Sequence, residues 1–457
     1  MTERTFDVIV LGAGPAGEVA AGRLADGGLS VALVEPELVG GECSFYACMP
    51  SKALLRPGQL IAEARRVPGA AEALTGELDV DAVLTRRDEV IHDLDDTVQL
   101  PWIESKGIEL IRGEGRLDGE RRVAVGDDVL VANRAVVVAT GSAAALPPID
   151  GLDGIEPWTN REATTAKTVP ARLAVLGGGV AGVELAQAWR TLGAQLTILE
   201  RSDRLLDREE PFASEQVADA CRALGIDVRL DAAVKSVRAE GDEVVVELDD
   251  EAPVRADELL VSAGRRPRTE GIGVESVGLE AGESVEVDDQ MRATAVAGDW
   301  LFAVGDVNGR VLLTHMGKYQ ARAAADTILG KDAAVTGDGP GSPRVTFTEP
   351  QVAAVGHTLA SARQAGLNVR AVDVPTEAPA GGSFIGKDAA GTCRIVVDED
   401  RRTIVGATFT GVEVAEAIHA ATIAVVGEVP LDRLWHAVPS FPTRSEIWLN
   451  LLEEYGL

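Results

Sequence analysis

Two stretches of the chain, residues 6–37 and 171–203, repeat the same order of apolar and polar positions. In each, an apolar run leads into a cluster of glycines, a pattern typical of a helix follows, and a second apolar run ends at an acidic residue. The order predicts a strand, a glycine turn, a helix and a second strand. The two stretches stay in the same register, 165 residues apart, from the first glycine to the closing acid.

These glycines predict that the chain binds two dinucleotides. The first glycine of such a fingerprint permits a tight turn, the second lets a pyrophosphate approach the backbone, and the third lets helix and strand pack closely. The helix N-terminus supplies N–H groups for the phosphates, and the acid accepts from ribose hydroxyls. One glycine-rich turn is weak evidence, whereas two matched copies are strong. The residues are Gly12, Gly14, Pro15, Ala16, Gly17 and Glu35 in the first copy, and Gly177, Gly179, Val180, Ala181, Gly182 and Glu200 in the second.

The second copy favours NADH over NADPH. A carboxylate at Glu200 would repel a 2′-phosphate, and a glycine at Gly182 also fits NADH better than an alanine would. Arg201 and Arg204 follow closely and leave NADPH open as the less favoured nucleotide.

Composition and charge narrow the class of protein. The chain has 457 residues, enough for about three domains. Its formal net charge of −30 argues against nucleic acid and anionic membranes as partners. We identify no signal peptide at the N-terminus and no apolar run of about 20 residues, so we expect a cytoplasmic protein without a membrane span.

Two of the four cysteines, Cys43 and Cys48, are close in sequence. Along an ideal helix they would lie about 7.5 Å apart, more than the roughly 7 Å that a disulfide can bridge. A disulfide therefore requires that the segment bends, and Gly40, Gly41 and Pro50 make such irregularity plausible. A thiol at a helix N-terminus would also have a lowered pKa, as a reactive thiolate needs.

Two other interpretations of the pair stay open. A metal site would need two further ligands, which no local Cys or His cluster supplies, so we expect no metal. Two unrelated core cysteines are the other possibility. We interpret Cys221 and Cys393, each alone in its segment, as structural.

With these motifs the chain resembles the pyridine nucleotide-disulfide oxidoreductases, the flavoprotein family of dihydrolipoyl dehydrogenase, glutathione reductase and mercuric reductase. The resemblance covers about residues 5–447. Besides the two glycine fingerprints it is carried, in the family's order, by Gly40-Gly41-Glu42-Cys43, Cys48-Met49-Pro50-Ser51-Lys52, Ala139-Thr140-Gly141-Ser142, Gly264-Arg265-Arg266-Pro267 and Val304-Gly305-Asp306.

The resemblance implies that electrons pass from NADH to FAD and from FAD to a disulfide. Cys48 would face the flavin and Cys43 would be the interchange thiol that meets the substrate. Lys52 would lie near the flavin N5 and pair with Glu184, and Asp306 would hold the ribityl chain. Further FAD- or NAD-binding positions would be Gly41, Glu42, Thr140, Gly141, Ser142, Arg201, Gly264, Arg265, Gly305, Leu313, Thr314 and His315.

The resemblance also implies an α/β fold: two Rossmann-like dinucleotide-binding domains, for FAD and NAD, and a C-terminal α+β dimerisation domain. We expect the FAD domain over 1–150 and 276–336, the NAD domain over 151–275 and the dimerisation domain over 337–457. Residues 330–343, "GKDAAVTGDGPGSP", are a glycine- and proline-rich linker by composition. In the family the last domain completes the partner's active site, so we expect a homodimer.

The C-terminal motif departs from the family. Disulfide reductases of this family have a catalytic His and Glu here; this chain keeps the acid as Glu446 but has Phe441 at the base position. Phenylalanine cannot move a proton, which puts the usual mechanism in doubt. His436 lies upstream without a role in the motif, and His315 could contact the flavin edge or fill a turn. Mercury reduction is not expected, because the chain ends "NLLEEYGL" without a cysteine pair.

Three functions are therefore weighed. The first is an NADH-dependent disulfide or dithiol oxidoreductase that works through Cys43 and Cys48. The second is a quinone reductase that acts directly from the flavin, which Phe441 favours. The third is a flavin-binding subunit of a larger dehydrogenase complex, but we identify no lipoyl or partner-binding extension that would support this role.

Overall fold

The computed structural model describes residues 2–249 and 251–457; residues 1 and 250, which fall in the predicted FAD- and NAD-binding domains, lie outside the described residues. The chain contains two compact units. Unit 1 comprises Met1–Pro50, Asp88–Ala145 and Arg265–Gly339, and unit 2 comprises Ser51–Arg87, Leu146–Gly264 and Pro340–Leu457. The boundaries expected for the FAD, NAD and dimerisation domains stay predictions.

Unit 1 is built on a seven-stranded sheet in the order β3-β2-β1-β6-β5-β4, with β16 paired to β6. Strands β1, β2, β3, β6 and β16 run parallel, whereas β5 pairs antiparallel with both β6 and β4. The strands are β1 (Glu3–Leu11), β2 (Val31–Glu35), β3 (Glu109–Arg112), β4 (Gly115–Leu117), β5 (Arg122–Val125), β6 (Asp128–Val138) and β16 (Leu301–Ala303), and a separate pair is formed by β7 (Ser142–Ala144) and β15 (Arg265–Pro267).

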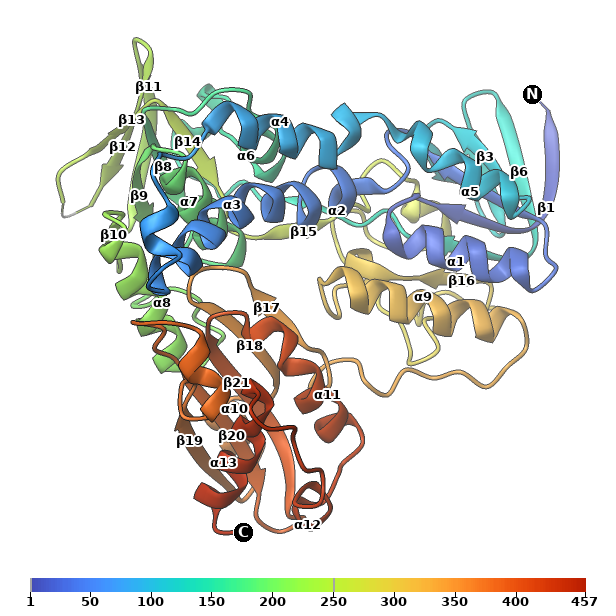
Figure 1. The fold of residues 1–457 in the computed structure, drawn as a ribbon. Helices are drawn as coiled ribbons and strands as arrows, with labels where there is room; N and C mark the ends of the chain where they lie inside the picture. Colours follow the sequence, from blue (N-terminus) through green and yellow to red (C-terminus); the bar gives the residue numbers. More distant parts are fainter. Residues whose placement is uncertain (1, 250) are drawn as a thin grey trace. The chain divides into compact units, whose positions relative to one another are not determined.

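Both faces of this sheet are covered, as a parallel sheet requires. Successive side chains of a strand point to opposite faces, so Val8 and Val10 join one core while Ile9 and Leu11 join another. On the first face, α1 (Pro15–Asp26) and α9 (Thr314–Ile328) pack side by side (Figure 1). Two further helices of this unit are α2 (Gly41–Phe45) and α5 (Leu100–Ser105).

The first part of unit 2 repeats the arrangement on a smaller scale. A parallel sheet in the order β10-β9-β8-β14 carries α7 (Val180–Thr191), and a three-stranded antiparallel sheet, β11-β12-β13, packs against it. The elements are α6 (Asn160–Thr165), β8 (Arg172–Leu176), β9 (Gln195–Leu199), α8 (Pro211–Ala223), β10 (Asp227–Arg229), β11 (Val234–Glu240), β12 (Glu243–Leu248), β13 (Val254–Ala256) and β14 (Glu258–Val261).

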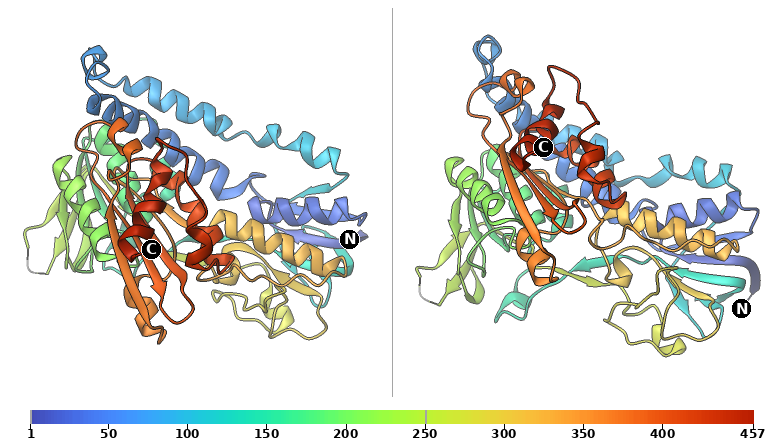
Figure 2. Two further views of the ribbon diagram at one scale, coloured as in Figure 1. Left: turned by 60° about the horizontal axis from the view of Figure 1, so that its bottom comes forward. Right: turned by 90° about the horizontal axis from the view of Figure 1, so that it is seen from below.

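The C-terminal part of unit 2 is a five-stranded antiparallel sheet, β17-β18-β21-β20-β19, packed against helices. Helices α11 and α13 lie against its strands around a core that includes Phe409 and Leu451; Figure 2 shows them in red in front of the orange strands. The elements are β17 (Arg344–Thr346), β18 (Gln351–Gly356), α10 (Leu359–Gln364), β19 (Val369–Pro375), β20 (Thr392–Asp398), β21 (Thr403–Gly411), α11 (Ile418–Val426), α12 (Leu431–Leu434) and α13 (Ile447–Tyr455).

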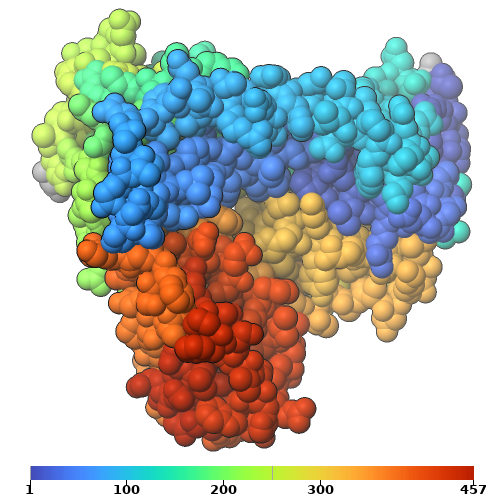
Figure 3. All heavy atoms as spheres, viewed as in Figure 1, coloured from blue at the N-terminus to red at the C-terminus, as the bar shows by residue number. Residues whose placement is uncertain are grey.

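Residues 51–87, from an early part of the chain, belong to unit 2. They include most of α3 (Cys48–Arg66) and of α4 (Val80–Val90). Gln59 donates a hydrogen bond to the carbonyl of Phe347, and Arg66 pairs with Glu349 at 2.6 Å. In Figure 3 the blue atoms of this segment adjoin the orange atoms of the C-terminal part of the same unit. Among the described residues, no helix has the length and apolar character needed to cross a membrane.

Candidate active site

The first glycine turn joins β1 to α1. Gly12 has a φ of +99°, and a Cβ there would lie 2.5 Å from the carbonyl oxygen of Ala139. A Cβ on Gly17 would lie 1.9 Å from the carbonyl oxygen of Gly12, so this glycine is needed for helix and strand to meet. Around Gly14, in contrast, no atom lies within 4 Å of a built Cβ. The backbone is therefore open where a pyrophosphate would approach, which fits a dinucleotide.

The acid that closes the first copy is held by the glycine turn itself. The Glu35 carboxylate accepts hydrogen bonds from the backbone N–H groups of Ala13, at 2.7 Å, and Glu37, at 2.8 Å. Burial raises the pKa of Glu35, and these two backbone hydrogen bonds oppose that effect. The side chain thus has a fixed orientation at the end of β2, where the ribose hydroxyls of a bound nucleotide are expected.

The second copy reproduces this geometry. A Cβ on Gly177 would lie 2.7 Å from the carbonyl oxygen of Ser262, and no atom lies within 4 Å of one built on Gly179. Glu200 accepts from the N–H groups of Gly178, at 2.5 Å, and Ser202, at 2.7 Å. The donors are again 165 residues after those that serve Glu35. Around this turn Val180, Ala181 and Arg201 are exposed.

A polar cluster in unit 1 holds Asp306. Ser142 donates to the Asp306 carboxylate at 2.5 Å, and Arg265 donates to the Ser142 hydroxyl at 2.6 Å. Arg265 itself is 3.7 Å from Asp306. These three predicted residues therefore meet, although they come from three separate segments of the chain.

Arg268 joins the same unit through two predicted residues. It pairs with Glu42 at 3.0 Å, and its carbonyl accepts from the Thr140 hydroxyl at 2.7 Å. The sequence reasoning missed Arg268, and its position three residues after Arg265 was the available signal. The remaining predicted residues of this unit are Gly41 in α2, Gly141 between β6 and β7, Gly305 in a 3₁₀ turn, and Leu313, Thr314 and His315 at the start of α9. Gly264 directly precedes β15 and is the last residue of its stretch of unit 2.

The two thiols face each other across a break between helices. Cys43 lies in α2, Cys48 is the first residue of α3, and Tyr46 and Ala47 between them are not helical. The pKa of the Cys43 thiol is raised, first by its hydrogen bond with Cys48 and then by burial. Cys48 Sγ also lies 3.4 Å from the hydroxyl of Thr314, the first residue of α9.

This geometry changes one expectation and extends another. The segment between Cys43 and Cys48 bends as a disulfide would require, and the two thiols lie close enough to form a hydrogen bond. The lowered thiol pKa that was expected does not hold for Cys43, because its hydrogen bond with Cys48 and its burial both raise the pKa. The contact between Thr314 and Cys48 was not anticipated from the sequence.

Lys52 and Glu184 form the expected ion pair, within unit 2. Lys52 Nζ lies 2.7 Å from Glu184 Oε2, and the side chains are 36% and 3% exposed. The other carboxylate oxygen accepts from the N–H of Phe347 at 2.7 Å, and the Lys52 ammonium lies 4.8 Å from the centre of the Phe347 ring. The sequence gives no signal for Phe347, which lies 163 positions after Glu184.

The C-terminal motif also lies in unit 2. The Phe441 side chain is 76% exposed, and His436 is exposed as well. The Glu446 carboxylate accepts from the N–H of Thr443 at 3.3 Å, which caps the turn before α13. The predicted site residues thus form two sets: one in unit 1 around the thiols, and one in unit 2 with Lys52, Glu184, the second glycine turn and Glu446.

Comparisons with known proteins identify the family of the chain. The family model for pyridine nucleotide-disulphide oxidoreductases matches residues 6–322, and that for the dimerisation domain of the same family matches residues 342–451. A dihydrolipoyl dehydrogenase of Haloferax volcanii is 32% identical over 98% of this chain and 95% of its own length, and a mercuric reductase of Staphylococcus aureus is 28% identical over 96% and 81%.

Solved structures show the same likeness. The Cu(II) complex of the HOCl-induced flavoprotein disulfide reductase RclA from Escherichia coli superposes with a TM-score of 0.87 at 25% identity, covering 98% of this chain and 99% of that one. LpdA from Mycobacterium tuberculosis, at 24% identity and a TM-score of 0.87, shares the fold over the full length of both chains. The expected α/β fold and the use of FAD with a nicotinamide dinucleotide are confirmed. The chain belongs to the pyridine nucleotide-disulphide oxidoreductases.

Proposed function

We propose that the protein passes electrons from NADH, by way of FAD, to a Cys43–Cys48 disulfide and from there to a disulfide-type acceptor. The observation that carries the proposal is the pair of thiols, hydrogen-bonded to each other at the start of α3 in the unit that also holds the first dinucleotide fingerprint. The relatives of this chain are disulfide and mercuric reductases, and this similarity does not favour a quinone as the acceptor.

In this proposal the first glycine turn, Glu35 and Asp306 hold FAD, which supplies two-electron transfer between the nicotinamide and the thiols. The second glycine turn and Glu200 bind NADH. Both Glu200 oxygens already accept backbone N–H groups, which supports a fixed carboxylate that would repel a 2′-phosphate. Replacing Glu200 by alanine is expected to lower KM for NADPH relative to KM for NADH.

The transfer of a proton distinguishes this chain from its disulfide-reducing relatives. To attack an acceptor disulfide, Cys43 must lose its proton, and its hydrogen bond with Cys48 raises the pKa of that thiol. Phe441 has no group that can take it. In the variant Phe441→His we therefore expect turnover with lipoamide to rise by about 10²-fold, the usual range for general acid–base help.

The acceptor is tested by anaerobic NADH oxidation with FAD-loaded enzyme. Lipoamide and other small disulfides form one arm, and a naphthoquinone forms the other. Turnover with a disulfide that is lost in Cys43→Ser supports the proposal. Turnover with quinone alone, unchanged in Cys43→Ser, would place the chemistry at the flavin and contradict it.

A second candidate acceptor is Cu(II). The relative RclA has been solved as a Cu(II) complex, and a metal ion needs no proton from the enzyme when it is reduced. One dithiol would reduce two Cu(II) to two Cu(I), form the Cys43–Cys48 disulfide and release two protons. NADH oxidation that depends on Cu(II) and on both cysteines, while disulfides are inactive, would favour this acceptor.

We also propose a cytoplasmic homodimer. The family's dimerisation domain covers residues 342–451, and this part exposes apolar side chains that a second copy could bury, among them Phe384, Ile423, Val438 and Phe441. Sedimentation analysis of the full chain should give twice the 47.8 kDa of one chain. A monomer at micromolar concentration would contradict the proposal.

A further inference from the structure

The turn that carries Asp306 is shaped by one buried amide. This 3₁₀ turn (Gly305–Asn308) follows β16, and the N–H of Gly305 donates to Oε1 of Gln320 at 2.8 Å. The side-chain amide of Asn308 donates to the same oxygen at 2.9 Å. Gln320 is 0% exposed, so both ends of the turn depend on where its oxygen points.

The other end of the Gln320 amide meets an aspartate from the predicted linker. Gln320 Nε2 donates to Asp338 Oδ2 at 3.2 Å, and Arg310 Nε lies 2.8 Å from the same oxygen. The Asp338 side chain is 2% exposed. An ionised carboxylate only accepts hydrogen bonds, so Asp338 obliges Gln320 to present its NH₂ group there and its oxygen to the turn.

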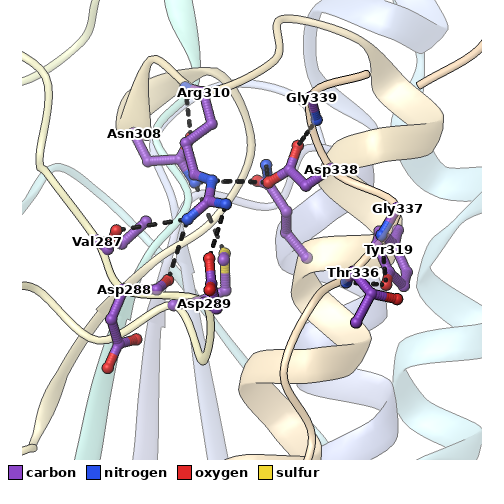
Figure 4. Close-up of polar contacts among 12 residues, drawn as sticks. Val287, Asp288, Asp289, Asn308, Arg310, Tyr319, Thr336, Gly337, Asp338 and Gly339 are labelled. Carbon is purple, nitrogen blue, oxygen red and sulfur yellow. Dashed lines mark hydrogen bonds and ion pairs between the residues drawn. The ribbon is translucent and has the colours of Figure 1, made fainter. Parts of the chain in front are cut away.

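Several further contacts anchor the linker segment 335–339 to the rest of unit 1. Figure 4 shows Arg310 between Asp338 and Asp289, with 3.0 Å between Arg310 Nη2 and Asp289 Oδ1. The hydroxyl of Tyr319 accepts from the N–H groups of Thr336 and Gly337, at 2.9 and 3.4 Å. The segment is therefore anchored by side chains, although its composition is that of a linker.

We propose that Asp338 is a positioning residue for FAD: it orients Gln320 and, through Gln320, the turn that presents Asp306. The inference rests on the proposed role of Asp306 toward the ribityl chain. Because coupling free energies are reciprocal, FAD binding in turn anchors segment 335–339, the last part of unit 1 before the chain enters unit 2 at Pro340. A segment that composition marks as a spacer thus belongs to the cofactor site.

The test compares Asp338→Asn with Asp332→Asn in the full-length protein. Both changes remove one charge from the predicted linker 330–343, but Asp332 is exposed and its contact in the described residues is the 3.4 Å one with Gln290. An asparagine at 338 keeps an acceptor for Gln320 in only one of its two amide orientations and lacks the charge that pairs with Arg310, so it holds the orientation of Gln320 less firmly. We expect the FAD dissociation constant to rise about tenfold in Asp338→Asn and to stay unchanged in Asp332→Asn.

Two readouts separate positioning from general destabilisation. KM for NADH should be the same in both variants once FAD is saturating, because the proposed NADH site lies in unit 2. Hydrogen exchange of the 335–339 amides should slow when FAD binds to the wild type, and this slowing should disappear in Asp338→Asn. The FAD dissociation constant and the hydrogen-exchange readout need no electron acceptor, so they stand apart from the outcome of the acceptor experiment.

Equal FAD affinity in the two variants, with exchange over 335–339 that does not respond to FAD in the wild type, would overturn the inference. If Asp338→Asn does not fold, Tyr319→Phe replaces it, since this change removes only the acceptor for Thr336 and Gly337. It should raise the FAD dissociation constant and speed exchange of these two amides. Unchanged values in Tyr319→Phe would then refute the coupling.

Discussion

The ion pair of Lys52 and Glu184 predicts an unequal response to removal of its two members. The Glu184 side chain is 3% exposed, whereas that of Lys52 is 36% exposed. Lys52→Met leaves a carboxylate in a place that water barely reaches, with the Phe347 N–H as its remaining donor. Removing one partner of a buried ion pair costs about 3–5 kcal/mol, and we expect about 3 kcal/mol here.

Glu184→Gln should cost much less. The glutamine oxygen can still accept from Phe347, and the Lys52 ammonium can turn toward solvent. For a partner that is one-third exposed, a loss of about 1 kcal/mol is expected. The double variant should be close to Glu184→Gln, because a neutral amide needs no cation. Adding Glu184→Gln to Lys52→Met should thus restore about 2 kcal/mol.

Urea denaturation followed by circular dichroism measures these differences. Arg56→Met is a matched control, since Arg56 lies in the same helix and pairs with Glu63 at 2.7 Å, but with side chains 46% and 27% exposed. It should change the free energy of unfolding by less than about 1 kcal/mol. A loss in Glu184→Gln as large as that in Lys52→Met, or no recovery in the double variant, would refute this reasoning.

Three further predictions concern the cofactor turn and the thiols. Gly14→Ala has room for its Cβ and should fold normally while binding FAD more weakly. Gly17→Ala should in addition lower the melting temperature, because its Cβ would lie 1.9 Å from a carbonyl oxygen. Equal melting temperatures of the two variants would contradict this prediction. Burial raises the pKa of Glu18 from 4.5 to about 7. Between these pH values the folded protein keeps a proton on Glu18 that the unfolded chain loses. The free energy of unfolding should therefore fall as the pH rises from 4.5 to about 7. Glu18→Gln should accordingly be more stable than the wild type by about 2–3 kcal/mol at pH 8 and equal to it at pH 4, as measured by urea denaturation; the same difference at both pH values would count against the raised pKa. In the reduced enzyme, iodoacetamide should alkylate Cys43 slowly at pH 8 and faster in Cys48→Ser, because the hydrogen bond with Cys48 is the largest cause of its raised pKa; an unchanged rate would speak against that cause.

The parts of the site that local pattern determines could be predicted from the sequence. Apolar runs, a glycine turn and a closing acid define both dinucleotide units, because each unit is local in sequence and its side-chain period is set by the strand and the helix. The break between α2 and α3 was expected at the glycines and proline around it. The structure places it at Tyr46 and Ala47, with Pro50 in the first turn of α3, where a proline leaves no hydrogen bond unmade.

Contacts between distant segments could not be derived in this way. The hydrogen bond of Phe347 to Glu184 and the pairing of Asp338 with Arg310 each join residues whose sequence neighbourhoods show no complementary pattern. The composition of residues 330–343, rich in glycine and proline, predicts a linker. One buried aspartate side chain nevertheless outweighs that composition, because it only accepts hydrogen bonds and its oxygen meets both the buried Gln320 amide and the Arg310 guanidinium.

The same limit applies to the proton that the thiol chemistry needs. A motif comparison shows that Phe441 replaces a base, but it cannot show that Cys43 holds its proton more firmly than a free thiol does. The two findings point the same way: the hydrogen bond with Cys48 and burial raise the pKa of the Cys43 thiol, and the position that would take its proton is apolar. Disulfide acceptors need proton transfer at both of their sulfur atoms, whereas a thiophilic metal ion displaces the thiol protons directly when it binds. The comparison of lipoamide with Cu(II) therefore tests a physical property of Cys43 as much as the choice of acceptor.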